Sequence, residues 1–235
     1  MNQHQANGEQ NGVPLRVIVL KMSHRSVKNY SYLVVEPGRR LAVIVDPAWE
    51  MEKIKQALIE AHARLSGILI THSHPDHINL AEPLAAKHDC PIWMSTEEIE
   101  FSGFNARHLV AIDATPWPVG EMVIEPILTP GHTPGCTCYV IGDNLFSGDV
   151  LFAEGCGICP DIRAAHTMFA SLQNLKGRLK PQTRVFPGHS YGKQPGQLLS
   201  RLLEENIYMH FSDKESFAAF RMRKGQDMAK LFSFQ

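Results

Sequence analysis

The chain has 235 residues, of which 44% are hydrophobic and 20% are charged, and its formal net charge is -1. Such a composition is typical of a globular protein with a sizeable core, and the lack of a basic excess argues against a nucleic-acid-binding protein. Because the sequence has no apolar run near the roughly 18 residues of a membrane span, no signal-peptide pattern at its start and only five cysteines, we expect a cytoplasmic protein with no membrane partner and no disulfide framework.

Residues 1–14 are rich in Asn, Gln and Gly and lack apolar periodicity, which predicts a disordered N-terminal tail. Residues 15–235 contain no segment with the composition of a linker, so we expect a single domain with a short helical C-terminus. The first half of this domain alternates short apolar runs with amphipathic segments. We expect strands over residues 15–20, 32–35, 41–45, 67–71 and 91–94, and helices over residues 51–65, 80–88 and 96–101.

The second half of the chain is equally rich in short apolar runs. We expect strands over residues 122–128, 138–141, 144–146 and 184–186, and helices over residues 165–179, 198–209 and 216–231. Two strand-rich halves with interspersed helices predict an α/β architecture, in which two sheets pack against each other and helices cover the outside.

The segment THSHPDH follows directly after the apolar run of residues 67–71. In an extended backbone, residues two positions apart point the same way, so His72 and His74 can bind one metal ion together. Asp76 and His77 follow where the chain turns, and they can reach a second ion beside the first. Imidazole nitrogens and carboxylate oxygens are suitable ligands for zinc. A single histidine is more often an ordinary surface or core residue, but four candidate ligands within six residues indicate a metal site.

Three further candidate ligands, His132, Asp149 and His189, each end an apolar run. Glycine and proline surround them, as in loops that converge on a binding site. Together they would supply the remaining donors for two ions, and an aspartate can bridge such a pair. We assign no metal role to the other histidines, which are His4, His24, His62, His88, His108, His166 and His210.

THSHPDH resembles the HxHxDH signature of the metallo-β-lactamase superfamily, and the three later candidates match its further motifs in their usual order. The resemblance implies an αββα four-layer sandwich with a two-metal site at one edge. The ligands that it implies are His72, His74 and His132 for one ion and Asp76, His77 and His189 for the other, with Asp149 bridging. This set is similar to that of glyoxalase II. We expect two Zn²⁺, and Fe or Mn would accept the same donors. Asp46 matches a position usual across the superfamily, where we expect it to support the metal loop rather than bind an ion.

Two branches of the superfamily with similar ligands differ from this sequence around its GCG motif at residues 155–157. Glyoxalase II typically has a basic residue after the motif and a long helical C-terminal domain, whereas Ile158 follows here and only a short segment remains after His189. Tyr191 does match a substrate-side tyrosine of glyoxalase II, so Ile158 and Tyr191 are candidate substrate-binding residues. Persulfide dioxygenases continue the motif with Arg-Thr-Asp, where this sequence has Ile-Cys-Pro-Asp.

A third branch is more similar. LFAEGCGICPD, MFASLQNLK and TRVFPGHSYG resemble segments of the zinc-dependent hydrolases of bacterial trans-acyltransferase polyketide clusters, which look like thioesterases that remove acyl groups from acyl carrier proteins. The resemblance implies a binuclear hydrolase whose substrate is carried by an acyl carrier protein or another small thioester. Hydroxyacylglutathione hydrolysis and persulfide dioxygenation stay open as alternatives, as does a non-catalytic accessory protein that binds carrier proteins. The oligomeric state also stays open.

The implied site predicts a specific reaction. Two adjacent metal ions would lower the pKa of a bridging water toward about 7, which supplies hydroxide at neutral pH. That hydroxide attacks the thioester carbonyl, while the second ion stabilises the oxyanion. Asp76, as a ligand and a hydrogen-bond acceptor, is the candidate catalytic residue that orients the nucleophile. A thioester suits this chemistry because its thiolate leaves without protonation.

Charge is unevenly distributed along the second half of the chain. Between Ile162 and Leu203 there are basic residues and no acidic ones. The basic residues are Arg163, Lys176, Arg178, Lys180, Arg184, Lys193 and Arg201. Because carrier proteins are acidic, a basic face beside the His189 loop would attract them, and the alternative is an ordinary solvated surface.

Overall fold

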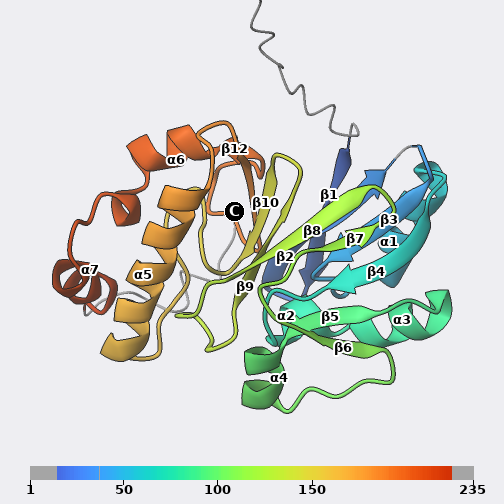
Figure 1. The fold of residues 1–235 in the computed structure, drawn as a ribbon, viewed down its shortest axis with the longest axis horizontal. Helices are drawn as coiled ribbons and strands as arrows, with labels where there is room; N and C mark the ends of the chain where they lie inside the picture. The colour runs from blue at the N-terminus through green and yellow to red at the C-terminus, as the bar shows by residue number, and fades with distance from the viewer. Residues whose placement is uncertain (1–14, 37, 224–235) are drawn as a thin grey trace, which may run out of the picture.

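The computed structural model describes residues 15–36 and 38–223, so the predicted N-terminal tail at residues 1–14 lies outside the described ranges. Figure 1 shows two sheets that pack face to face, with helices on the outer side of each. Among the described residues, no helix is long and apolar enough to cross a bilayer.

The first sheet comes from the N-terminal half of the chain. Its strands, in spatial order, are β1 (Arg16–His24), β2 (Val27–Glu36), β3 (Leu41–Val45), β4 (Arg64–Leu69), β5 (Ile92–Ser95) and β6 (Leu109–Ile112). β1, β2 and β3 pair antiparallel, whereas β3 to β6 run parallel to one another. The parallel part matters for the site, because loops that leave the carboxyl ends of parallel strands gather at one edge.

The second sheet comes from the C-terminal half. Its strands, in spatial order, are β12 (Gln197–Leu198), β11 (Arg184–Pro187), β10 (Asn144–Gly148), β9 (Thr137–Ile141), β8 (Met122–Leu128) and β7 (Trp117–Val119). β10 and β11 are parallel, and the other neighbours pair antiparallel. The carboxyl ends of β10 and β11 therefore also meet at one edge.

Helices cover both outer faces of the sandwich (Figure 1). The helices of the described residues are α1 (Met51–Glu60), α2 (Pro75–Ile78), α3 (Ala81–His88), α4 (Thr96–Ser102), α5 (Ile162–Arg178), α6 (Leu199–Glu205), the 3₁₀ turn η1 (Ile207–Met209) and α7 (Lys214–Arg221). One apolar cluster joins the first sheet to α1 and α3, and another joins the second sheet to α5, α6 and α7. A third cluster lies between the sheets. These layers confirm the expected αββα sandwich.

The alternation of side chains along the strands explains why three clusters form. On β2, Tyr32 and Val34 belong to the cluster between the sheets, while Leu33 and Val35 belong to the cluster under the helices. A strand of this kind is buried on both faces, so it appears in the sequence as a continuous apolar run. Because the inner cluster contains residues of both sheets, the two halves share a core. That residues 15–235 form one domain stays a prediction.

Two helices are shorter than expected. The helix expected over residues 51–65 ends at Glu60, because His62 adopts a left-handed backbone conformation (φ 49°) and β4 begins at Arg64. The helix expected over residues 198–209 is broken at Asn206, which is extended (φ -88°, ψ 110°) and accepts a hydrogen bond from the backbone N–H of Tyr208. The short elements β6, β7, β12 and α2 have no counterpart in the expectations, because two to four residues cannot show a periodic pattern.

The last expected helix, over residues 216–231, is observed only in part. The structure has α7 over Lys214–Arg221, and residues 224–231 lie outside the described ranges.

Backbone hydrogen bonds tie the loops at the functional edge to one another. The N–H of Thr137 donates to the carbonyl of Thr71 (2.9 Å), and the N–H of Gly188 donates to the carbonyl of Gly148 (2.8 Å). Gly148 has a φ of 48°, and a Cβ at this position would lie 2.3 Å from the Thr71 hydroxyl. Only glycine therefore allows the end of β10 to approach the loop after β4 so closely.

Candidate metal centre

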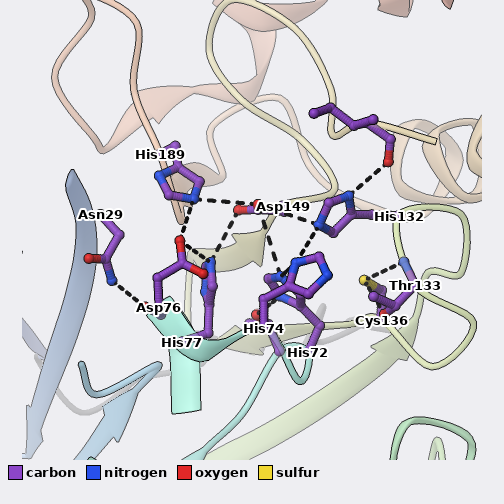
Figure 2. A network of polar contacts seen from close by, with 12 residues as sticks. Asn29, His72, His74, Asp76, His77, His132, Thr133, Cys136, Asp149 and His189 are labelled. Carbon is purple, nitrogen blue, oxygen red and sulfur yellow. Dashed lines mark hydrogen bonds and ion pairs between the residues drawn. The ribbon is translucent and has the colours of Figure 1, made fainter. Parts of the chain in front are cut away.

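The first four candidate ligands lie in the loop after β4 and in α2. His74 is extended (φ -65°, ψ 145°), and its Nδ1 lies 3.1 Å from Nε2 of His72, so the expected pairing of these two side chains is observed. Pro75 then begins α2, as proline commonly does at the first helical position. This single turn carries Asp76 and His77 to the neighbouring space, as Figure 2 shows.

A buried carboxylate supports this loop from behind. Asp46, 2% exposed, accepts hydrogen bonds from the backbone N–H and the hydroxyl of Thr71 (2.8 and 2.7 Å) and from Nδ1 of His77 (2.8 Å). The Thr71 hydroxyl in turn lies 3.0 Å from Nδ1 of His72. Both imidazoles are thereby fixed through Nδ1, and their Nε2 atoms face the centre. Asp46 thus contacts the loop in the way expected of a supporting residue.

His132 and His189 reach the same place from the second sheet. His132 follows β8 and donates from Nδ1 to the carbonyl of Ile158 (2.8 Å), and His189 follows β11 and donates from Nδ1 to the carbonyl of Lys28 (2.8 Å). A backbone acceptor on Nδ1 fixes each ring and leaves Nε2 to face the centre. Nε2 of His132 lies 3.0 Å from Nδ1 of His74, so candidate ligands from the two sheets meet directly.

Asp149, which follows β10, lies in the middle of the centre (Figure 2). Its Oδ2 atom is 3.6 Å from Nε2 of His132, 3.5 Å from Nε2 of His189 and 4.0 Å from Nε2 of His72. Its Oδ1 atom is 3.5 Å from Nε2 of His77. One carboxylate therefore contacts imidazoles on both sides.

The candidate ligands form three overlapping groups, within each of which the ligand atoms lie within 4.8 Å of one another. The groups are His72, His74 and His132; His72, His77 and Asp149; and Asp76, His77 and His189. The first and third are the two sets that the resemblance implied, and the second joins them through Asp149. Among the described residues, no other histidine belongs to such a group. The role of the seven residues as ligands stays a prediction.

Two buried atoms at the centre test whether it suits a metal ion. Within the described part of the chain, Nε2 of His77 and Oδ1 of Asp149 have no hydrogen-bond partner. Buried polar atoms without a partner cost free energy, so such atoms usually bind something. Since the surrounding donors are imidazole nitrogens and carboxylate oxygens, the residues present fit a divalent cation such as Zn²⁺.

Burial and close pairing determine the charges of the metal-free centre. Burial alone would raise the pKa of Asp149, but the imidazoles of His189 and His77 hold it well below its ordinary value. Burial lowers the pKa of His77, yet the carboxylates of Asp149 and Asp46 outweigh it and raise this pKa to about 9. For His72, burial dominates and holds the pKa well below its ordinary value. At neutral pH His77 is therefore the charged imidazolium in the metal-free centre, and His72 is the neutral imidazole.

The two candidate substrate-binding residues lie near different candidate ligands, Ile158 near His132 and Tyr191 near His189. Ile158 is half-buried, and its carbonyl accepts the hydrogen bond from His132. Tyr191, 38% exposed, packs with its ring centroid 5.6 Å from that of Phe152, which in turn lies 6.3 Å from that of His189. Both residues thus border the candidate ligands, and substrate contact by either stays a prediction.

Three residues that contact the ligand loops were not predicted from the sequence. They are Thr71, described above; Asn29 of β2, whose side-chain amide donates to the carbonyl of Asp76 (2.5 Å); and Glu98 of α4, whose carboxylate accepts a hydrogen bond from the backbone N–H of Ser73 (2.7 Å). Thr71 directly precedes the histidine cluster, which is a usable signal. Asn29 and Glu98 are distant in sequence, and nothing local distinguishes them from surface residues.

The basic stretch does not form a uniformly basic face. Arg178 pairs with Glu125, and Lys193 and Arg201 both pair with Glu205. Acidic partners from outside the stretch therefore offset part of its charge.

Comparison with known proteins identifies the family. Residues 26–189 match the model of the metallo-β-lactamase superfamily. The chain belongs to the metallo-β-lactamase superfamily. The chain is 46% identical to the probable polyketide biosynthesis zinc-dependent hydrolase BaeB of Bacillus velezensis. The 209 aligned residues cover 88% of this chain and 93% of BaeB. It is 40% identical to PksB of Bacillus subtilis, another probable polyketide biosynthesis zinc-dependent hydrolase. The 213 aligned residues cover 90% of this chain and 95% of PksB.

Other similarities are more distant. The chain is 40% identical to a hydroxyacylglutathione hydrolase of Alkalilimnicola ehrlichii. The 163 aligned residues cover 69% of this chain and 62% of that protein. A crystal structure of a metallo-β-lactamase from Staphylococcus aureus has the same fold, with a TM-score of 0.79 and 22% identity over 94% of this chain and 72% of the other. These findings confirm the resemblance stated on the histidine motif.

Proposed function

We propose that the protein is a binuclear zinc hydrolase of acyl thioesters and that it removes acyl groups from acyl carrier proteins in a polyketide pathway. The observation that carries this proposal is the position of Asp149, which contacts imidazoles of both predicted ligand sets. BaeB and PksB are by name probable zinc-dependent hydrolases of polyketide biosynthesis, which supports the same reaction class.

The two outer groups of donors would each hold one ion. The proposed ligands are His72, His74 and His132 for the first and Asp76, His77 and His189 for the second, with Asp149 shared. Divalent cations bound there supply an acidified water as nucleophile at neutral pH and a positive charge for the developing oxyanion.

The contribution of the chain itself is to orient the reactants. Oδ2 of Asp76 lies 3.3 Å from Nε2 of His189 and 3.8 Å from Nε2 of His77. Burial raises the pKa of Asp76, but these two imidazoles outweigh it and the pKa falls below its ordinary value. Asp76 therefore stays ionised, and it can accept a hydrogen bond from the attacking water and direct it toward the carbonyl carbon.

The leaving group favours a thioester over an amide. A thiolate leaves without taking up a proton, whereas an amine needs a general acid placed beside it. The buried carboxylate Asp149, with a pKa held well below its ordinary value, is a poor proton donor. A substrate that needs no proton on departure suits this centre.

Hydrolysis of hydroxyacylglutathione is the second candidate. Tyr191 beside His189 and the similarity to the hydroxyacylglutathione hydrolase favour it. Ile158, in place of the basic residue typical of glyoxalase II, disfavours glutathione as the carrier. Persulfide dioxygenation and carrier binding without turnover are the remaining alternatives. We also propose a cytoplasmic location, which the carrier-protein substrate requires.

A comparison of thiol carriers tests the proposal. The zinc-loaded protein is offered the same acyl group on an acyl carrier protein, on coenzyme A and on glutathione, and kcat/KM is measured for each, with chelated protein as the blank. We expect the carrier-protein thioester to be preferred over the glutathione thioester by at least about tenfold, which is about 1.4 kcal/mol. A preference for glutathione would replace the proposed substrate with the second candidate. No zinc-dependent hydrolysis of any of the three would overturn the hydrolase proposal itself.

A further inference from the structure

α4 places a buried carboxylate between two of the ligand-bearing loops. Glu98 is fully buried, although its neighbours Glu97 and Glu100 on the same helix are exposed. Ser95, Thr96, Glu97 and Glu98 form a capping-box sequence, and the Ser95 hydroxyl accepts a hydrogen bond from the N–H of Glu98 (3.2 Å). The Glu98 side chain, however, points away from its own helix and contacts the loops.

Each oxygen of this carboxylate contacts a different loop. Oε1 accepts hydrogen bonds from the backbone N–H and the hydroxyl of Ser73 (2.7 and 2.6 Å). Oε2 accepts from the hydroxyl of Thr133 (2.6 Å) and the N–H of Gly135 (3.0 Å). Ser73 separates His72 from His74, and Thr133 directly follows His132; Figure 2 shows Thr133 on the His132 side of the centre. Glu98 therefore links the two loops that carry the first group of donors.

The helix and the loop are also in direct contact. A Cβ at Gly135 would lie 2.1 Å from the backbone nitrogen of Glu98, and the hydroxyl of Ser95 donates to the carbonyl of Gly135 (2.6 Å). The fit leaves no room for another side chain at this position. A buried carboxylate is costly unless it is fully hydrogen-bonded, and here four donors satisfy it. A group held this tightly can fix the relative position of the loops.

We propose that Glu98 is a positioning residue that sets the metal affinity of the group formed by His72, His74 and His132. The other group has different supports, since Asp46 holds His77 and the carbonyl of Lys28 holds His189. The effect of Glu98 is therefore confined to one of the two ions. This inference rests on the proposed function, in which both groups bind zinc.

The variant Glu98→Gln tests this role, because it keeps the size of the side chain and turns an acceptor oxygen into a donor. Whichever oxygen it replaces, that donor would face a backbone N–H, either of Ser73 or of Gly135, which is also a donor, so one link to a loop is lost. Zinc binding is measured stepwise by competition with a chromophoric chelator. We expect one of the two dissociation constants to rise by about 10- to 100-fold, the range for residues that orient metal ligands, and the other to stay unchanged. Glu97→Gln and Glu100→Gln, on the exposed face of α4, are matched controls that should change neither.

Two variants that each lack a predicted ligand of one group identify which ion is affected. In His189→Ala, which keeps the first group intact, adding Glu98→Gln should weaken the remaining zinc site. In His132→Ala, which keeps the second group, the same addition should have no effect. Thr133→Val keeps the carboxylate and removes the hydroxyl that donates to Glu98 and also lies 3.0 Å from Sγ of Cys136. It should weaken the same site if Glu98→Gln does not fold.

The outcomes separate this inference from the function on which it rests. If the wild-type chain binds two zinc ions and Glu98→Gln weakens both equally or neither, Glu98 has no selective positioning role, and the proposed function stands. If the wild-type chain binds fewer than two ions, both the inference and the binuclear proposal fail.

Discussion

Asp149 is the residue at which the two outer groups of donors meet. Its Oδ1 atom contacts His77 at 3.5 Å, and its Oδ2 atom contacts His132 at 3.6 Å and His189 at 3.5 Å. The same residue is important without metal, because its carboxylate offsets the positive charge of buried imidazoles. Its removal should therefore affect metal binding and the stability of the metal-free chain separately.

We predict that Asp149→Asn lowers zinc-dependent hydrolysis by at least about 100-fold, since even residues that only orient metal ligands change activity by about 10- to 100-fold. In the metal-free chain at neutral pH, the protonated His77 would keep Asp46 at 2.8 Å but lose Asp149, and His189 would lose the same carboxylate. The free energy of unfolding should then fall, by up to about 3–5 kcal/mol, the usual cost of removing one partner of a buried ion pair. Denaturant unfolding of the metal-free proteins measures this fall, with the exposed Asp143→Asn as a control. Equal stability of Asp149→Asn and wild type would contradict the charge argument.

The pKa of His77 predicts how zinc affinity depends on pH. Because its pKa in the metal-free centre is about 9, the ring holds a proton at neutral pH that a bound ion must displace. Apparent zinc affinity should therefore rise with pH below about 9, by up to about tenfold per pH unit for each proton released. Calorimetry in buffers of different ionisation enthalpy should detect the release of at least one proton near pH 7. An affinity that stays constant between about pH 6 and pH 8 would be inconsistent with this charge state.

At the scale of elements, the break between α6 and η1 connects the helical layer to the loop after β10. Asn206, 1% exposed, interrupts the helix and donates from its side-chain amide to the carbonyls of Phe152 (3.0 Å) and Gly155 (2.9 Å). The same loop continues to Ile158, whose carbonyl fixes His132. The break between the C-terminal helices thus contacts the loop that leads to the candidate metal centre.

We predict that Asn206→Ala lowers the free energy of unfolding by roughly 2–6 kcal/mol. The buried carbonyl of Phe152 loses its donor and the N–H of Tyr208 loses its acceptor, at about 1–3 kcal/mol each, while the carbonyl of Gly155 keeps the N–H of Phe152 as a donor. Denaturant unfolding of the chelated protein measures this change. Asn105→Ala, at an exposed position, should stay within about 0.5 kcal/mol of wild type. If both variants behave alike, the link between Asn206 and the loop has no energetic role.

At the scale of the whole molecule, much of the fold follows from local patterns in the sequence. β3 and β8 have the bounds expected from their apolar runs, and the stripe of Met168, Leu172 and Leu175 packs α5 on the second sheet, as expected for a helix. Several elements that the sequence did not predict share a cause. Short edge strands and the break at Asn206 depend on partners distant in sequence, which no local periodicity reveals.

The candidate site divides in the same way. The cluster from His72 to His77 is contiguous, so its spacing alone predicts a metal site. His132, Asp149 and His189 come close to this cluster only because the two sheets pack together. The resemblance to a known family was therefore needed to group them with it. Neither the spacing of residues nor the family resemblance predicted the role of Glu98, because a buried glutamate and an exposed one look the same in the sequence.

The zinc content of the purified chain tests the central claim most directly. After dialysis against zinc and removal of the free ion, metal analysis should give two zinc ions per chain. Chelation should abolish thioester hydrolysis, and added zinc should restore it. One ion or none per chain, or hydrolysis that survives complete chelation, would contradict the account of two ions held on either side of Asp149.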